Sequence, residues 1–586
     1  MWRKVGSGAV GLTVVGAALV SAGGAAAAPA GGADPVARLV RSMSLEDKVG
    51  QLFVTYAYGA TAATTDPSDV AQNRALLGVD TAAQAVQRYH LGGVIYFGYS
   101  GNLVDPTQVA TLSNDLQTAA TTSGPRIPLL ISTDQEGGNV TRIGAPLAVS
   151  PGNMAIGASF DPRVAYATNQ ATGQQLRALG IRVDDAPVID TNTNPANAAD
   201  GPRAFGDTAA QTSIGGAAAI AGLQGTGVAA TAKHFPGLGS TEVNTDFGVA
   251  TTDRSRADFE RYDLPAFHAA VAAGTDEIMA AHIVAPALDP SGAPASLSAP
   301  MVTGILRNQL HYDGVVVTDA LDAEALQEYS NVQRSVLALQ AGVDQLLMPP
   351  DLAGAVAGVL AAVRSGELST ARIDQSVTRI LRLKSKLGLF SANRVDVGKV
   401  ASSVGTAAQV AAMTDAAQRS ITLYRNDGTL PLARGKRVLV TGYGVTTGQT
   451  LTADITAKGA TTTRVYTGSA PSEAAIAAAV AAARSNDVAV VVTNNAWSDP
   501  AQRDLVQRLQ ATGTPTVVLA VGAPYELGYL PDVRTFVASY GYQPVSLQAA
   551  TDVLFGRSPT GRSPITIRTP DGASVVASLG SGLRYR

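Results

Sequence analysis

The chain of 586 residues contains no cysteine. Disulfide bonds, thiolate metal sites, a cysteine nucleophile and a lipid-modified cysteine are therefore excluded. An excess of charge of one sign is also absent, because 43 basic and 46 acidic side chains leave a net charge of −3. Without a basic cluster or an acidic tail, the sequence predicts neither nucleic-acid binding nor a charged, solvated segment.

The motifs of several common enzyme classes are missing as well. The 5 histidines show no HExxH or HxH spacing, which argues against a metal hydrolase. No GxSxG or P-loop sequence is present, and the GxG at residues 225–227 lacks the rest of a dinucleotide-binding fingerprint. We therefore expect no metal and no organic cofactor.

Long apolar runs are absent except near the start of the chain. Arg3 and Lys4 precede an apolar run at residues 9–20, and the small residues "AAAAPA" follow at residues 25–30. This order is typical of a secretory signal peptide, which we predict at residues 1–28. The alternative is an uncleaved membrane anchor, but the apolar run is short for a span of about 20 residues. The sequence thus predicts a secreted protein with no membrane span after cleavage.

The remaining chain has the composition of a protein with large buried cores, since 46% of its residues are hydrophobic and 15% are charged. Short apolar runs alternate with longer Ala- and Leu-rich segments of helical period, a pattern that indicates a parallel sheet. Eight such runs within residues 34–390 predict a (β/α)8 barrel, with an open doubly wound sheet as the alternative. The expected strands are residues 51–56, 92–97, 128–133, 182–190, 229–235, 277–284, 314–320 and 343–349.

A second, smaller α/β sandwich domain is predicted after the barrel. The helical segment 365–390 closes the first domain, and residues 391–416 are predicted to form a linker with some helix. Residues 417–586 then alternate strands and helices again. The expected strands are residues 436–444, 461–468, 487–496, 514–522 and 534–542.

Unusual polar residues gather at the ends of the predicted barrel strands, where barrel enzymes carry their active sites. A polar residue at the end of an apolar strand needs a hydrogen-bonding partner or a ligand. Any one of them alone has a structural explanation, but the pattern recurs on five strands. The polar residues at the ends of these five strands are Asp134, Asp190, Asn192, Lys233, His234, His282 and Asp319.

Asp319 is the sharpest case, because it follows the apolar "GVVVT" directly. A carboxylate there is costly unless it is hydrogen bonded or functional. An aspartate can act as the nucleophile on the anomeric carbon of a sugar, and a second carboxyl group then serves as acid/base. Glu242 and Asp246, in a Gly- and Pro-bounded loop after the fifth strand, are candidates for this second group.

Several longer stretches together resemble glycoside hydrolase family 3, in particular its two-domain bacterial β-N-acetylglucosaminidases. They include "STDQEGGNVTRI" (132–143), "APVIDTNTNP" (186–195), "GPRAFGD" (201–207), "AKHFPGLG" (232–239) and residues 294–326 around "VVVTDAL". The resemblance is strong over residues 45–390 and looser in the C-terminal domain.

The resemblance implies a retaining mechanism in which Asp319 forms a covalent glycosyl-enzyme. It also implies sugar ligands in the matching motifs, namely Asp134, Arg142, Arg203, Lys233 and His234. Charged side chains form strong hydrogen bonds to sugar hydroxyls, and the cations favour the ionised nucleophile. We add two residues to the expected substrate-binding set: Asn244 for its place in the loop and His282 for its place at the end of the sixth strand.

The loop after the fifth strand departs from the family pattern. Relatives read "KHFPGHG…DSH", in which the last His is the acid/base and the Asp orients it, whereas this chain reads "KHFPGLG…NTD". Asn244 stands at the place of that Asp, Asp246 at the place of that His, and Leu238 at the place of the first loop His. The usual acid/base pair is therefore missing.

Three interpretations follow from this departure. In the first, which we favour, Asp246 is the acid/base, with Asn244 positioning it or a sugar substituent. In the second, Glu242 or a carboxyl group of the C-terminal domain such as Asp499 takes the role. In the third, the protein binds glycans without catalysis, which the costly Asp319 argues against.

The substrate and acceptor follow from the same residues. We expect a β-N-acetylglucosaminidase acting on cell-wall or chitin oligosaccharides, with a β-glucosidase or β-xylosidase as the alternative. An anionic Asp246 would repel a phosphate acceptor, so we expect water as the acceptor. A carbohydrate is the expected binding partner.

Overall fold

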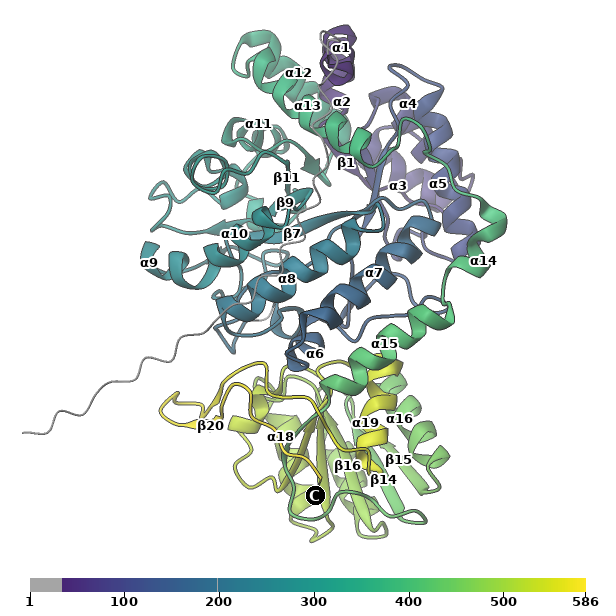
Figure 1. Cartoon of the computed structure of the whole chain (residues 1–586), viewed down its shortest axis with the longest axis vertical. Helices are drawn as coiled ribbons and strands as arrows, with labels where there is room; N and C mark the ends of the chain where they lie inside the picture. The colour runs from purple at the N-terminus through teal and green to yellow at the C-terminus, as the bar shows by residue number, and fades with distance from the viewer. Residues whose placement is uncertain (1–33, 198, 586) are drawn as a thin grey trace, which may run out of the picture.

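The computed structural model describes residues 34–197 and 199–585, and these form two domains, one above the other in Figure 1. The predicted signal peptide lies outside the described residues. Among the described residues, no helix is long and apolar enough to cross a membrane.

The first domain is built on a parallel sheet of eight strands that closes almost completely into a barrel. The sheet order is β11-β9-β7-β6-β3-β2-β1-β12, and a bridge between Val317 and Gln345 joins its two ends. This confirms the predicted (β/α)8 barrel. Its strands are β1 (Phe53–Thr55), β2 (Gly93–Ile95), β3 (Leu130–Thr133), β6 (Val183–Asp184), β7 (Ala229–Phe235), β9 (Glu277–Ala280), β11 (Val315–Thr318) and β12 (Leu346–Leu347).

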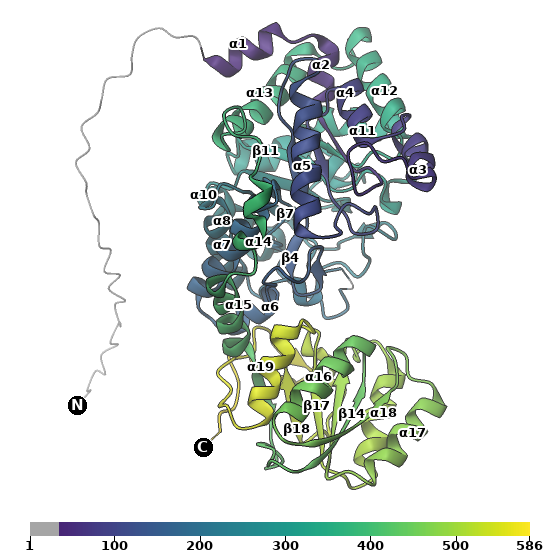
Figure 2. The same ribbon diagram turned by 90° about the vertical axis from the view of Figure 1, so that its right-hand side faces the viewer.

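The helices of this domain surround the barrel (Figures 1 and 2). Several begin at an Asp-Pro pair, in which the Asp side chain accepts backbone N–H groups of the first turn and the Pro has the helical φ angle already. The helices are α1 (Pro35–Ser42), α2 (Leu45–Gly50), α3 (Pro67–Leu77), α4 (Ala82–Tyr89), α5 (Pro106–Thr121), α6 (Asn153–Ala158), α7 (Pro162–Ala178), α8 (Ala209–Gln224), α9 (Arg256–Asp258), α10 (Leu264–Ala272), η4 (Pro300–Gln309), α11 (Asn331–Ala341), α12 (Leu352–Ser365) and α13 (Thr370–Lys386).

Short additional strands lie at the end of the barrel that carries the predicted site. A hairpin follows β3 directly, and a parallel pair joins the loops after β7 and β9. They are β4 (Gln135–Gly137) with β5 (Val140–Thr141), and β8 (Ala250–Thr251) with β10 (Ile283–Val284).

The second domain is a six-stranded sheet with helices on both faces. Its order is β13-β18-β17-β16-β14-β15, and all neighbours are parallel except β13, an antiparallel edge strand that is not among the predicted strands. Leu439 faces a core with α17 and α18, whereas Val438 and Val440 face a core with α16 and α19. The elements are β13 (Thr422–Arg425), β14 (Arg437–Gly442), α16 (Val445–Ala457), β15 (Thr461–Tyr466), α17 (Glu473–Ala483), β16 (Val488–Thr493), α18 (Pro500–Gln510), β17 (Thr516–Ala520), β18 (Thr535–Ala538), α19 (Pro544–Leu554), β19 (Ile567–Arg568) and β20 (Val575–Ala577).

The segment between the domains is largely helical. It contains α14 (Val400–Ser403) and α15 (Ala407–Ser420), and α15 packs against α6 and α7 of the barrel and against α19 of the second domain. Figures 1 and 2 both show α15 running from one domain to the other. Arg419 adds an ion pair of 2.7 Å to Asp161, at the start of α7. The helix therefore fixes the two domains to each other.

Candidate active site

A cavity of about 660 Å3 opens at the carboxyl ends of the barrel strands. Its wall is formed by strand-end residues, by the β4–β5 hairpin and by the loop after β7. Eight of the nine residues predicted for the site line it: Asp134, Arg142, Arg203, Lys233, His234, Asn244, Asp246 and Asp319.

Asp319 is held at the mouth of the barrel by its own backbone. It follows β11, whose four residues are all buried, and its N–H donates to the carbonyl oxygen of Ala280 at 2.8 Å. Its carboxylate Oδ1 accepts the N–H of Ala320 at 2.8 Å. Oδ2 has no such partner among the described residues, which leaves one carboxylate oxygen for a reaction in the cavity.

The loop after β7 brings Asp246 to the same cavity. The N–H of Asp246 donates to Oδ1 of Asn244 at 2.9 Å, which folds the loop into a tight turn. The loop also docks on the segment after Asp319, where the N–H of Ala325 donates to the carbonyl oxygen of Thr245 at 3.2 Å. Although Asp246 is exposed, partial loss of water around its carboxyl group, together with the nearby charge of Asp319, raises its pKa. Such a shift suits a carboxyl group that must give up a proton.

The two alternative carboxyl groups lie elsewhere. Glu242 is exposed and does not line the cavity. Asp499 caps α18, where it accepts the N–H groups of Ala501 and Gln502 at 2.8 and 3.4 Å, and it does not line the cavity either. Of the three acid/base candidates, only Asp246 lines the cavity together with Asp319.

A chain of alternating charges also lines the cavity. Lys233 contacts Asp134 at 2.9 Å and Glu136 at 2.8 Å, and Arg142 contacts Asp134 at 3.2 Å. Arg203 donates two hydrogen bonds, of 2.7 and 2.8 Å, to the carboxylate of Glu136. Burial alone would raise the pKa of Asp134 and Glu136, but the adjacent cations outweigh it and hold both pKa values low. Glu136 was not among the residues predicted for the site, although it lies inside the "DQEGG" stretch.

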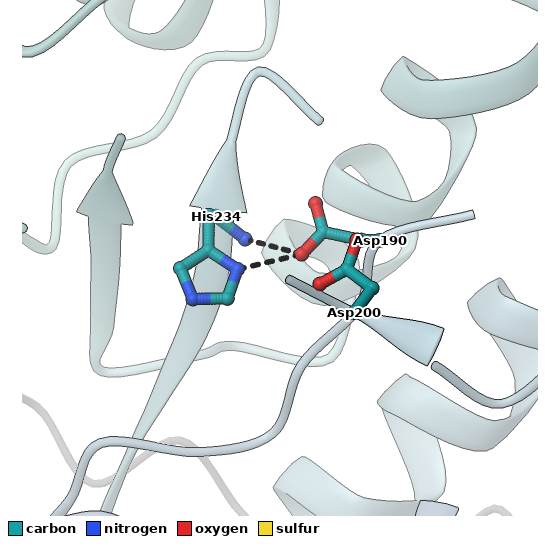
Figure 3. Close-up of side chains that lie close together, drawn as sticks. All are labelled: Asp190, Asp200 and His234. Carbon is teal, nitrogen blue, oxygen red and sulfur yellow. Dashed lines mark hydrogen bonds and ion pairs between the residues drawn. The ribbon is translucent and has the colours of Figure 1, made fainter. Parts of the chain in front are cut away.

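His234 belongs to a buried cluster with two aspartates (Figure 3). Its Nδ1 lies 2.6 Å from Oδ2 of Asp190, which also accepts the His234 backbone N–H at 3.2 Å. Asp200 lies beside Asp190 without a hydrogen-bond partner for either carboxylate oxygen among the described residues, and burial and the charge of Asp190 raise its pKa. A neutral Asp200 avoids two adjacent buried anions.

These three side chains also form the one group among the described residues whose ligand atoms lie close enough for a metal ion, within 4.8 Å of one another. The short contact between His234 and Asp190 is a hydrogen bond that already uses Nδ1. The arrangement therefore fixes the ring of His234 and points its Nε2 toward Arg203, at 3.4 Å.

The structure does not bring His282, the ninth predicted residue, to the cavity. It is fully buried, and its Nε2 contacts the carbonyl oxygen of Ala320 at 2.8 Å while Nδ1 contacts the hydroxyl of Ser296 at 2.7 Å. Since burial lowers its pKa, the neutral ring donates from Nε2 and accepts at Nδ1. Contrary to the prediction, His282 supports the residue after Asp319 rather than facing a substrate.

Comparisons with known proteins identify the family of the chain. A profile described as "Glycosyl hydrolase family 3 N terminal domain" matches residues 44–383, and one described as "Glycosyl hydrolase family 3 C-terminal domain" matches residues 421–579. The chain belongs to glycoside hydrolase family 3. The resemblance seen in the sequence is thereby confirmed.

The names of two relatives with similar sequences describe hexosaminidase or glucosidase activities. The chain is 34% identical over 382 residues to "Beta-hexosaminidase A" of Pseudoalteromonas piscicida, a match that covers 61% of this chain but only 63% of that relative. It is 29% identical to "Beta-N-acetylglucosaminidase/beta-glucosidase" of Cellulomonas fimi, over 89% of this chain and 94% of the relative.

A solved structure of the family has the same two-domain arrangement. It is the family 3 beta-N-acetylglucosaminidase from Paenibacillus sp. str. FPU-7, with a TM-score of 0.81 and 35% identity, covering 90% of this chain and 100% of that one. A "Beta-glucoside phosphorylase BglX" at 22% identity and a TM-score of 0.77 shares the fold.

Proposed function

We propose that this family 3 protein is a secreted retaining β-N-acetylglucosaminidase. It would release terminal β-linked N-acetylglucosamine from cell-wall or chitin oligosaccharides. The proposal rests on one observation: Asp319 and Asp246 line the same cavity. The choice of N-acetylglucosamine is supported by the names of two relatives whose matches cover most of this chain.

In the first half of the reaction, a carboxylate oxygen of Asp319 attacks the anomeric carbon. The bond from that carbon to the leaving oxygen breaks, and the protonated Asp246 gives its proton to this oxygen. Lys233, Arg203 and Arg142, together with Asp134, offer hydrogen bonds to the sugar hydroxyls from the cavity wall.

In the second half, the roles of Asp246 reverse. Its carboxylate takes a proton from water while the water oxygen attacks the anomeric carbon, and the bond to Asp319 breaks. The sugar leaves with its original configuration, and Asp246 is protonated again. An anionic acceptor such as phosphate would meet the anionic Asp246, so water is the acceptor we propose.

The second candidate is the release of β-glucose. It rests on the name of the Cellulomonas fimi relative, which combines the two activities. Export rests on the N-terminal segment at residues 1–28 and agrees with the name of a 38% identical relative, "Uncharacterized secreted glycosyl hydrolase" of Arthroderma benhamiae.

Nitrophenyl β-glycosides of N-acetylglucosamine, glucose and xylose test the proposal in one assay. We expect the N-acetylglucosaminide to be the preferred substrate and Asp319→Asn to lower its kcat by about 1000-fold or more. Preferential turnover of the glucoside would select the second candidate, and full activity of Asp319→Asn would contradict the mechanism.

The role of Asp246 is tested by changing the leaving group. With a poor leaving group, Asp246→Asn should lower kcat/KM by about 100- to 10,000-fold, because protonation is then essential. With an activated leaving group the loss in the first step should shrink, and the fall of activity at high pH should disappear. Near-full activity of Asp246→Asn on the poor leaving group would remove Asp246 from this role.

A further inference from the structure

The C-terminal domain reaches into the cavity through one residue. Among the lining residues in the described part of the chain, Asn495 is the single one that comes from beyond the barrel domain. It lies two residues after β16, the strand at the middle of the second sheet. The site is therefore composed of both domains.

The backbone around Asn495 is firmly held. The residue has φ +54, a left-handed conformation that Asn tolerates better than most residues. The side chain of Gln502 bonds both the N–H and the carbonyl oxygen of Asn494, at 3.0 and 3.1 Å. Arg503 donates to the carbonyl oxygens of Ala496 and Trp497 at 2.6 and 2.7 Å. The loop thus presents Asn495 in a fixed position.

The side-chain amide of Asn495 is free to bind. It is half-buried, and the described part of the chain offers it no hydrogen-bond partner. Gly522, after β17, leaves room for it: a Cβ atom there would lie 3.0 Å from Oδ1 of Asn495 and 2.4 Å from Oδ1 of Asn494. A donor and an acceptor are therefore both available at the edge of the cavity.

The same domain also holds the hairpin that carries the sugar-binding wall. Nε2 of Gln543 donates to the carbonyl oxygen of Gly138, between β4 and β5, at 2.6 Å. Asn192, after β6, contacts the hydroxyl of Tyr525 at 3.4 Å. Because this hairpin contributes Arg142 to the cavity, the second domain is anchored on the side where the sugar hydroxyls are bound.

We propose that Asn495 binds the sugar whose anomeric carbon is attacked by Asp319, through hydrogen bonds between its amide and a hydroxyl or acetamido group of that sugar. The inference rests on the proposed function. A neutral amide fits this place, since it adds a donor and an acceptor without disturbing the charges of the barrel wall. The second domain is then a determinant of sugar specificity.

Glycosyl fluorides test this contact, because their leaving group is a single atom. Asn495→Ala should lower kcat/KM by about 10-fold or more with N-acetylglucosaminyl β-fluoride and by a similar factor with the nitrophenyl glycoside. Asn494→Ala is the matched control: within the described part of the chain its buried side-chain Oδ1 has no hydrogen-bond partner, and Asn494 does not line the cavity, so activity should stay within about threefold. Both variants should keep the melting temperature of the wild type.

Two results would overturn the assignment. If Asn495→Ala matches the wild type on both substrates, Asn495 binds no sugar. If only the nitrophenyl glycoside is affected, Asn495 contacts the leaving group instead. Failure of the proposed function looks different, since the wild type would then prefer another glycosyl fluoride or hydrolyse none. In that case, calorimetric binding of the free sugars to wild type and Asn495→Ala still decides whether the contact exists.

Discussion

At the scale of single residues, the site is organised by matching buried charges. Glu136 has a side chain that is only 2% exposed, yet it contacts both Lys233 and Arg203. A buried carboxylate of this kind is stable only while its cations remain in place. The pairing in turn keeps the amine and the guanidinium oriented toward the cavity. Glu136 is therefore a positioning residue for Lys233 and Arg203, the two cations that we propose as sugar ligands.

Glu136→Gln should disturb both cations at once. The amide keeps the size of the side chain but removes the charge, so Arg203 loses its bidentate partner. We expect a destabilisation of about 3–5 kcal/mol, seen in urea unfolding, and a rise in KM. Glu242→Gln changes an exposed carboxylate of the active-site loop and should leave both quantities nearly unchanged. Equal behaviour of the two variants would refute the positioning role.

At the scale of elements, the barrel strands were predictable because they are short apolar runs that end in a polar residue. Asp319 after β11 illustrates this, since four buried residues and a carboxylate define both the strand and the site. The edge strand β13 was missed because half of its residues are only partly buried and its antiparallel pairing leaves no signal in a short segment.

Contacts between elements were beyond the reach of the sequence. His282 has the pattern of a site residue, but the chain folds Ser296 and Ala320 against it and turns it into a structural group. Asn495 has no local signal, because its position depends on how α15 docks the second domain. Glu136 carried a signal only as part of a longer motif. Contacts between residues far apart in the chain decide such cases: the partners of His282 lie 14 and 38 residues away, and Arg203 lies 67 residues from Glu136.

Asp344 joins several elements of the barrel. It lies just before β12, is fully buried, and pairs with Arg307 of η4 at 2.5 Å and with Arg372 and Arg379 of α13 at 3.2 and 3.3 Å. Burial would raise the pKa of Asp344, but the three guanidinium groups lower it. The cluster fastens the last helix of the domain to the strand that closes the barrel.

Asp344→Asn should therefore lower the free energy of unfolding by about 3–5 kcal/mol, since three partly buried cations lose their counter-charge. Asp313→Asn is the control, because the Asp313 side chain is 78% exposed although it also pairs with Arg379. The control should cost less than about 1 kcal/mol. Thermal and urea unfolding of both variants measure the difference. Similar losses of unfolding free energy in both variants would show that the buried cluster stabilises the fold no more than the exposed ion pair does.

At the scale of the whole molecule, the interior holds many carboxyl groups that favour the neutral form. Burial raises the pKa of Asp185 to about 7, helped by the charge of Asp134, and it raises the pKa of Asp184 and Glu277 well above the usual range. The second domain repeats the pattern, where burial raises the pKa of Glu526 to about 7. Such groups couple the stability of the fold to pH.

Whether stability rises or falls with pH depends on whether the folded or the unfolded state loses its protons at lower pH. In the unfolded chain these carboxyl groups ionise near pH 4, whereas Asp185 in the folded protein keeps its proton up to about pH 7. Between these values the folded state binds more protons, so the free energy of unfolding falls as pH rises, by about 1.4 kcal/mol per pH unit for each group. Above the folded pKa, the contribution of that group stops changing.

We therefore expect the melting temperature to be highest in mildly acidic solution and to fall between about pH 5 and pH 8. Asp185→Asn removes one of the responsible groups and should make this decline shallower, with a gain in stability at pH 7. Asp532→Asn, which changes an exposed carboxylate, should keep the slope of the wild type. Melting curves of the three proteins across this range measure the effect. A melting temperature that rises steadily toward pH 8 would mean that the barrel interior holds these carboxyl groups in their charged form.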